Sequence, residues 1–92
     1  MLLLPATLTM HEARDALAML SQALRREPEG DIVIDASSLQ QFDTAAIAVL
    51  LECKRLAAAW GKGFAVRHTP PKLAALAKLY GVDNLMRLQN NV

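Results

Sequence analysis

Apolar residues recur along the chain at spacings that predict both strands and helices. The segment 2–8 is mainly apolar and is interrupted by Pro5, which predicts a short strand. Behind it, Thr9 and Glu12 have the spacing of a capping box, and leucine and alanine then recur every three or four positions. This pattern predicts a first helix that Pro28 and Gly30 end.

The same alternation of strand and helix continues to the end of the chain. The elements expected are a strand at 32–34, a helix at 43–60, a strand at 64–68, a helix at 71–80 that Gly81 ends, and a short element at 83–88 before a frayed end at 89–92. Strands that alternate with helices are typical of an α/β domain with crossover connections. We expect a single domain over residues 1–92, with helices mainly on one face of a small sheet.

The segment Asp43–Trp60 separates into two faces on a helical wheel. A broad apolar arc contains Ala46, Ile47, Val49, Leu50, Cys53, Leu56, Ala57 and Trp60. The opposite stripe is small or polar and contains Thr44, Ala48, Glu52, Arg55 and Ala59, with Ala45 nearby. The arc is expected to pack in the core and the stripe to face solvent.

Asp43 and Thr44, at the start of this helix, allow two interpretations. Either side chain can accept a hydrogen bond from an unpaired amide of the first turn, which is worth about 1 kcal/mol. Local sequence favours such a cap. Alternatively, a hydroxyl beside free amides and small neighbours suits contact with another protein, and this position also tolerates a phosphate.

Composition and charge narrow the range of functions. Ten basic and nine acidic residues give a net charge of +1, which argues against a nucleic-acid-binding protein. The one cysteine, Cys53, falls in the apolar arc and is expected to be a buried, reduced thiol. No segment has the form of a signal peptide or approaches the length of a membrane span, so at a membrane we expect another chain to hold this protein.

Candidate chemistry is sparse. The two histidines, His11 and His68, have no cysteine or carboxylate at metal-ligand spacing. Asp35 and Asp43 have no base or nucleophile beside them, and there is no glycine-rich phosphate loop. We therefore expect no catalytic residue, no cofactor and no metal site.

Two stretches together resemble a known family. A strand that ends in an acid, "IVIDASSL", precedes "FDTAAIAVLL", and this order is similar to the signature of STAS domains. Phe42 to Ile47 follow the family pattern in order, with Ala46 where glycine is commoner. With the downstream "LAALAKLYGV", the chain from about Asp31 to Leu88 looks like the MlaB-like branch, the stand-alone STAS subunits of MCE-type phospholipid ABC transporters.

The resemblance implies a fold and a role. It implies a small mixed sheet. STAS domains usually begin with two strands, but only about eight residues precede Thr9, so we expect the usual first strand to be lacking. Either the sheet is then shorter than usual, or an exposed edge pairs with another chain. The resemblance also implies a non-enzymatic cytoplasmic subunit, held at the inner membrane by its complex, that binds and supports an MlaF-like ATPase together with a permease and an MCE protein. The alternative is an anti-sigma factor antagonist that is switched by phosphorylation of Thr44. The partner is expected to contact six residues: Gln41, Asp43, Thr44, Ala45, Ala48 and Arg55.

Overall fold

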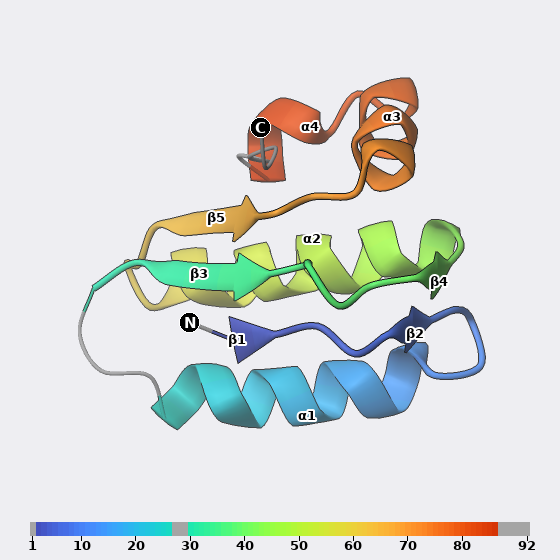
Figure 1. The fold of residues 1–92 in the computed structure, drawn as a ribbon. Coiled ribbons are helices and arrows are strands. Elements are labelled where there is room, and N and C mark those ends of the chain that lie inside the picture. Colours follow the sequence, from blue (N-terminus) through green and yellow to red (C-terminus); the bar gives the residue numbers. More distant parts are fainter. Residues whose placement is uncertain (1, 27–29, 87–92) are drawn as a thin grey trace.

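The computed structural model describes residues 2–26 and 30–86, which form short strands and four helices (Figure 1). In chain order the elements are β1 (Leu2–Leu3), β2 (Thr7–Leu8), α1 (Ala13–Arg26), β3 (Ile32–Asp35), β4 (Gln41–Phe42), α2 (Thr44–Ala59), β5 (Phe64–Arg67), α3 (Pro71–Leu79) and α4 (Asp83–Met86). The predicted α/β architecture is therefore confirmed.

The strands form two small parallel sheets. One has the order β1-β3-β5, with Ile32 opposite Phe64 and Ile34 opposite both Leu2 and Val66. The other pairs β2 with β4. The expected mixed sheet is wrong, since every strand pairing in the described parts of the chain is parallel. The reason is that α1 and α2 are crossover helices, each of which returns the chain to start the next strand in the same direction.

A single extended segment precedes α1 and spans both sheets. Pro5, which has no backbone N–H, interrupts it between β1 and β2. Leu4 still donates to the carbonyl of Asp35 (3.0 Å), and Ala6 accepts from Gln41 (3.0 Å). Within residues 2–26 there is thus one extended segment before α1 and no hairpin, so the usual first strand is lacking there and β1 lies at a sheet edge.

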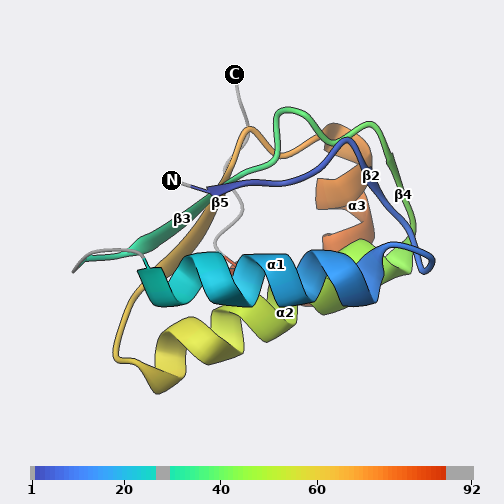
Figure 2. The ribbon, with the colours of Figure 1, turned by 90° about the horizontal axis from the view of Figure 1, so that it is seen from below.

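The helices cover one face of the larger sheet. Figure 2 shows α1 and α2 side by side on the same side of the strands, and Figure 1 places α3 and α4 beyond β5. Along β3, Ile32 and Ile34 are buried whereas Val33 is only half-buried, as expected for a strand with one covered face. The core is aliphatic, and its largest fully buried side chains include Leu4, Leu8, Leu20, Leu24, Ile32, Ile34, Leu50 and Leu73.

The start of α1 follows the predicted capping box in part. The Glu12 carboxylate accepts hydrogen bonds from the Thr9 hydroxyl (2.7 Å) and the Thr9 amide (2.9 Å), and these bonds lower the pKa of Glu12. In the reciprocal half of a capping box the hydroxyl accepts from the third amide. Here the Thr9 hydroxyl instead accepts from the amide of His11 (3.4 Å). Pro28, which was expected to end the helix, lies outside the described residues.

The ends of α2 and α3 show one departure and one agreement. Trp60, placed in the apolar arc by the helical wheel, is 40% exposed, because α2 ends at Ala59 and Trp60 is its C-cap. Gly81 was correctly predicted to end α3: its φ is +72°, which favours glycine, and its amide donates to Lys78 (3.0 Å). The predicted element at 83–88 appears as α4, and residues 87–92 lie outside the described part.

Candidate functional site

The Asp43 side chain joins the starts of two helices. Its Oδ1 accepts from the amide of Ala45 (2.8 Å), which is the N-cap bond of α2. Its Oδ2 accepts from the amide of Met10 (3.1 Å), in the turn before α1. Asp43 is therefore the cap, and it also fixes the position of α2 relative to a segment 33 residues away.

The small β2–β4 sheet supports this junction from the other side. Thr7 lies opposite Gln41, and Leu8 lies opposite Phe42, immediately before Asp43. Leu8 is fully buried and Phe42 is partly buried against the core, whereas Gln41 is exposed. The turn that starts α2 is thus held both by backbone pairing and by the Asp43 carboxylate.

Thr44 is left free of the capping role. It is the first residue of α2, it is exposed, and its hydroxyl makes no hydrogen bond with the described residues. Ala48, one turn on, is also exposed, and Ala45 is half-buried. The Thr44 hydroxyl and the methyl groups of Ala45 and Ala48 therefore form a surface without bulky side chains at the positive end of the helix dipole.

Arg55 lies two turns beyond Ala48 and forms an ion pair along the helix. Its Nε donates to Oε1 of Glu52 (3.0 Å), and a second guanidinium nitrogen contacts the same oxygen. The bond from Arg55 lowers the pKa of Glu52, and the bond to Glu52 raises the pKa of Arg55. Arg55 is exposed and Glu52 is half-buried at the helix surface, and such an ion pair along a helix contributes little to stability.

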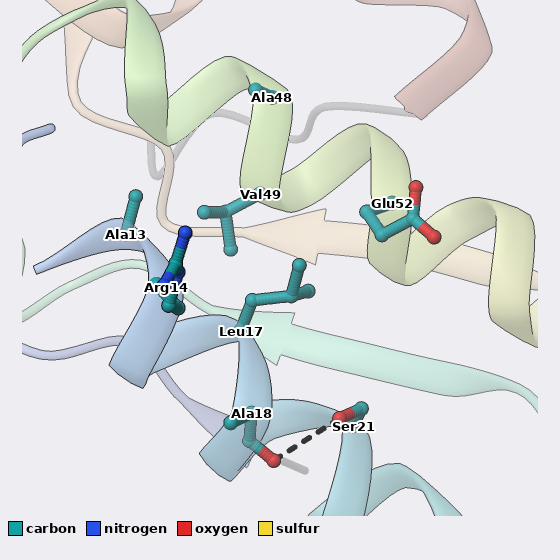
Figure 3. Close-up of a pocket in the computed structure, with 8 residues that line it drawn as sticks. All are labelled: Ala13, Arg14, Leu17, Ala18, Ser21, Ala48, Val49 and Glu52. Carbon is teal, nitrogen blue, oxygen red and sulfur yellow. Dashed lines mark hydrogen bonds between the residues drawn. The ribbon is translucent and has the colours of Figure 1, made fainter.

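The exposed ridge of α2, defined here as Thr44, Ala48 and Arg55, has a hollow on each flank. The first hollow, about 460 Å³, lies toward α3 and α4 and is lined by Thr44, Ile47, Ala48, Leu51, Tyr80 and Val82. The second, about 630 Å³, lies between α1 and α2 and is drawn in Figure 3. Its lining residues are Ala13, Arg14, Leu17, Ala18 and Ser21 of α1 with Ala48, Val49 and Glu52 of α2. Ala48 lines both hollows.

The structure brings together most, but not all, of the residues expected to contact a partner. Thr44 and Ala48 share a hollow, and Asp43 and Ala45 share a hydrogen bond. Arg55 lines neither hollow. Among the described residues it pairs with Glu52, which lines the second hollow together with Ala48. Reasoning from sequence missed Tyr80, which is 56% exposed and lines the first hollow, because it lies 36 positions from Thr44 along the chain.

The lining residues of the two hollows offer mainly apolar surface, with the hydroxyls of Thr44, Ser21 and Tyr80 among their polar groups. No group of three metal-ligating side chains occurs within residues 2–26 and 30–86. Cys53 is fully buried, and its burial raises the pKa of the thiol to about 11, so the thiolate is scarce at neutral pH. None of the helices in those ranges is long and apolar enough to cross a membrane.

Comparison with known protein families agrees with the fold. A family model described as "Mlab, STAS domain" matches residues 2–88, which include every described strand and helix. A search of curated proteins found no match to the chain. STAS domains act generally through protein interaction and are generally non-enzymatic. Because the match extends over almost the whole sequence, the chain belongs to the Mlab-type STAS domain family.

Proposed function

We propose that this protein is a subunit that binds and supports the ATPase of an MCE-type phospholipid ABC transporter. In this proposal residues 1–92 act as one STAS domain in the cytoplasm. The transporter complex, with its permease and MCE protein, holds the domain at the inner membrane. The ATPase hydrolyses the nucleotide, and this chain contributes a docking surface.

The observation that supports the proposal is that Asp43, and not Thr44, makes the hydrogen bonds that hold the start of α2. Asp43 supplies the cap of α2 and the bond to Met10, which leaves the Thr44 hydroxyl exposed and without a bond to the described residues. The Thr44 hydroxyl is therefore available for a hydrogen bond to a partner protein. The methyl groups of Ala45 and Ala48 allow a partner to approach the backbone of α2 closely.

Each predicted interface residue has a part in this proposal. Thr44 exchanges a hydrogen bond with the partner, and Ala45 and Ala48 pack against it. Gln41 and Arg55 form the polar rim at the two ends of the surface. Asp43 acts by holding the first turn of α2 in position.

The test is the affinity of the full chain for the MCE-transporter ATPase of the same organism, measured by calorimetry. Thr44→Glu and Ala45→Arg are expected to abolish binding, because each places a charge and added bulk in the contact. Thr44→Val, which keeps the shape, should weaken binding about tenfold, the value of roughly one hydrogen bond. Melting temperatures should remain close to that of the wild type.

A matched control comes from the other end of the same helix. Ala58 is exposed on α2 but far from Thr44, so Ala58→Arg should leave the affinity unchanged. Wild-type affinity in both Thr44→Glu and Ala45→Arg would contradict the proposal. Phosphate transfer to Thr44 from a cognate kinase and ATP, detected by mass spectrometry, would instead support the role of a switched antagonist.

A further inference from the structure

The hollow between α1 and α2 has an apolar floor with small side chains around it. Leu17 of α1 and Val49 of α2 face one another across it (Figure 3). Ala18 and Ala48 line it with methyl groups only. From Ala13 to Ser21 the lining covers eight residue steps of α1, about 12 Å at the rise of an α-helix. Its length therefore suits a partner segment of two to three helical turns.

The polar groups that line this groove are satisfied internally, with one exception. The Ser21 hydroxyl donates to the carbonyl of Ala18 (3.0 Å), as Figure 3 shows. The Glu52 carboxylate is engaged by Arg55. Arg14, by contrast, is exposed and has no ion pair or hydrogen bond with any described residue. The groove therefore offers an apolar surface with a single uncompensated positive charge at its edge.

We propose that this groove binds an amphipathic helix of the partner, with apolar side chains against Leu17 and Val49 and a carboxylate against Arg14. The inference rests on the proposed function and identifies a second contact of the same partner. Laying the apolar face of a helix into a groove is a common mode of recognition, and small residues allow the closer interhelical approach. The carboxylate is assigned by charge complementarity, because the other charge on the lining, Glu52, already has its partner.

The position of Ala48 assigns both contacts to the same partner. Ala48 lines the α1–α2 groove on one side and the Thr44 hollow on the other. A protein bound at Thr44 can therefore also contact the groove, because only the Ala48 side chain separates the two hollows. A second copy of this chain fits less well, since the acid it would present from the same groove is the Glu52 that Arg55 engages.

The inference is tested by filling the groove and by reversing its charge, with the same ATPase as the probe. Ala18→Arg should lower the affinity at least tenfold without changing the binding of nucleotide by the ATPase. Arg14→Glu should lower it by a similar factor, and Arg14→Gln should make the affinity less dependent on salt concentration. Arg14 is exposed, so its variants provide the test even where Ala18→Arg is poorly folded.

Matched controls lie on α1 outside the groove. Gln22→Arg introduces the same side chain as Ala18→Arg, and Arg26→Glu makes the same change in net charge as Arg14→Glu. Both residues are exposed, and both variants should bind within twofold of the wild type. Analytical ultracentrifugation of each variant completes the comparison, because a self-association surface would change the oligomeric state instead.

The outcomes separate this inference from the proposed function. Tight binding that is lost in Thr44→Glu but unchanged in Ala18→Arg and Arg14→Glu overturns the groove alone. Loss of a dimer in the groove variants at unchanged ATPase affinity also overturns it, in favour of a second copy. Absence of binding by the wild-type chain overturns the proposed function and this inference together.

Discussion

The buried face of α2 packs Leu50 and Cys53 with no exposed surface, whereas the ridge of the same helix presents Thr44 and Ala48 to solvent. Removing atoms from the buried face leaves a cavity in a closely packed core. Atoms removed from the ridge are replaced by solvent, and no cavity forms. The two faces therefore differ in what a substitution changes: stability on one, and contact with a partner on the other.

The same division occurs between neighbouring residues at the start of α2. The Asp43 carboxylate binds two backbone amides, one of them 33 positions away. A substitution of Asp43 is therefore expected to change stability, as a substitution in the core does. The side chain of Thr44 makes no bond with the described residues and belongs with the ridge. Position along the chain does not distinguish the two residues, but their hydrogen bonds do.

The largest effect is expected from Leu50→Ala. Leu50 is fully buried on α2, and truncating it should lower the free energy of unfolding by about 3 kcal/mol, with 2–5 kcal/mol the usual range. Ala48→Ser, on the ridge of the same helix, should change it by less than about 0.5 kcal/mol. Urea denaturation followed by circular dichroism measures both values. Equal losses would show that the faces are not distinct.

A smaller effect is expected from Asp43→Ala, which removes the cap and the bond to Met10. The free energy of unfolding should fall by about 1–2 kcal/mol, the upper part of the range of about 0.5–2 kcal/mol for loss of an N-cap, because the bond to Met10 is lost as well. Asp43→Asn, which keeps one oxygen acceptor, should recover part of it. Thr44→Ala should cost less than about 0.5 kcal/mol in the same urea titration. A larger loss in Thr44→Ala than in Asp43→Ala would reverse the assignment of cap and contact residue.

The smallest effect concerns pH and the turn that precedes α1. Hydrogen bonds from the Thr9 hydroxyl and amide lower the pKa of Glu12 in the folded protein. The stability that these bonds contribute is present above the unfolded pKa of about 4.3 and is lost as the pH falls through the lower folded value. Stability measured between pH 7 and pH 3 should therefore fall less steeply in Glu12→Gln. An unchanged slope in this variant would exclude a contribution from Glu12.

Helix positions were predictable because their signals are local. Periodic leucine and alanine placed α1 and α2 close to their observed bounds, and Gly81 marked the end of α3 through its backbone conformation. Trp60 was misplaced because the helical wheel assumes that the helix continues. The parallel pairing was missed because strand direction depends on how the crossovers return, which no local pattern encodes.

The candidate site was predictable only in part. The small and polar stripe of α2 identified Thr44, Ala48 and Arg55, because their spacing alone places them on the face opposite the apolar arc. Tyr80, Leu17 and the groove between α1 and α2 had no such signal. They line hollows beside the ridge only because α1 and the end of α3 lie on either side of α2.

By itself the sequence determined which segments are helices, which face of α2 is buried, and the family-like turn at Asp43–Thr44. These properties follow from periodicity and local hydrogen-bonding chemistry. The sequence allowed either Asp43 or Thr44 to cap α2, and the bond from the Ala45 amide assigns the cap to Asp43. Only the tertiary structure added the bond from the Met10 amide to Asp43, because two segments 33 residues apart must meet to form it. It also created the two hollows beside Ala48, since a groove is a property of two packed helices and not of either one alone.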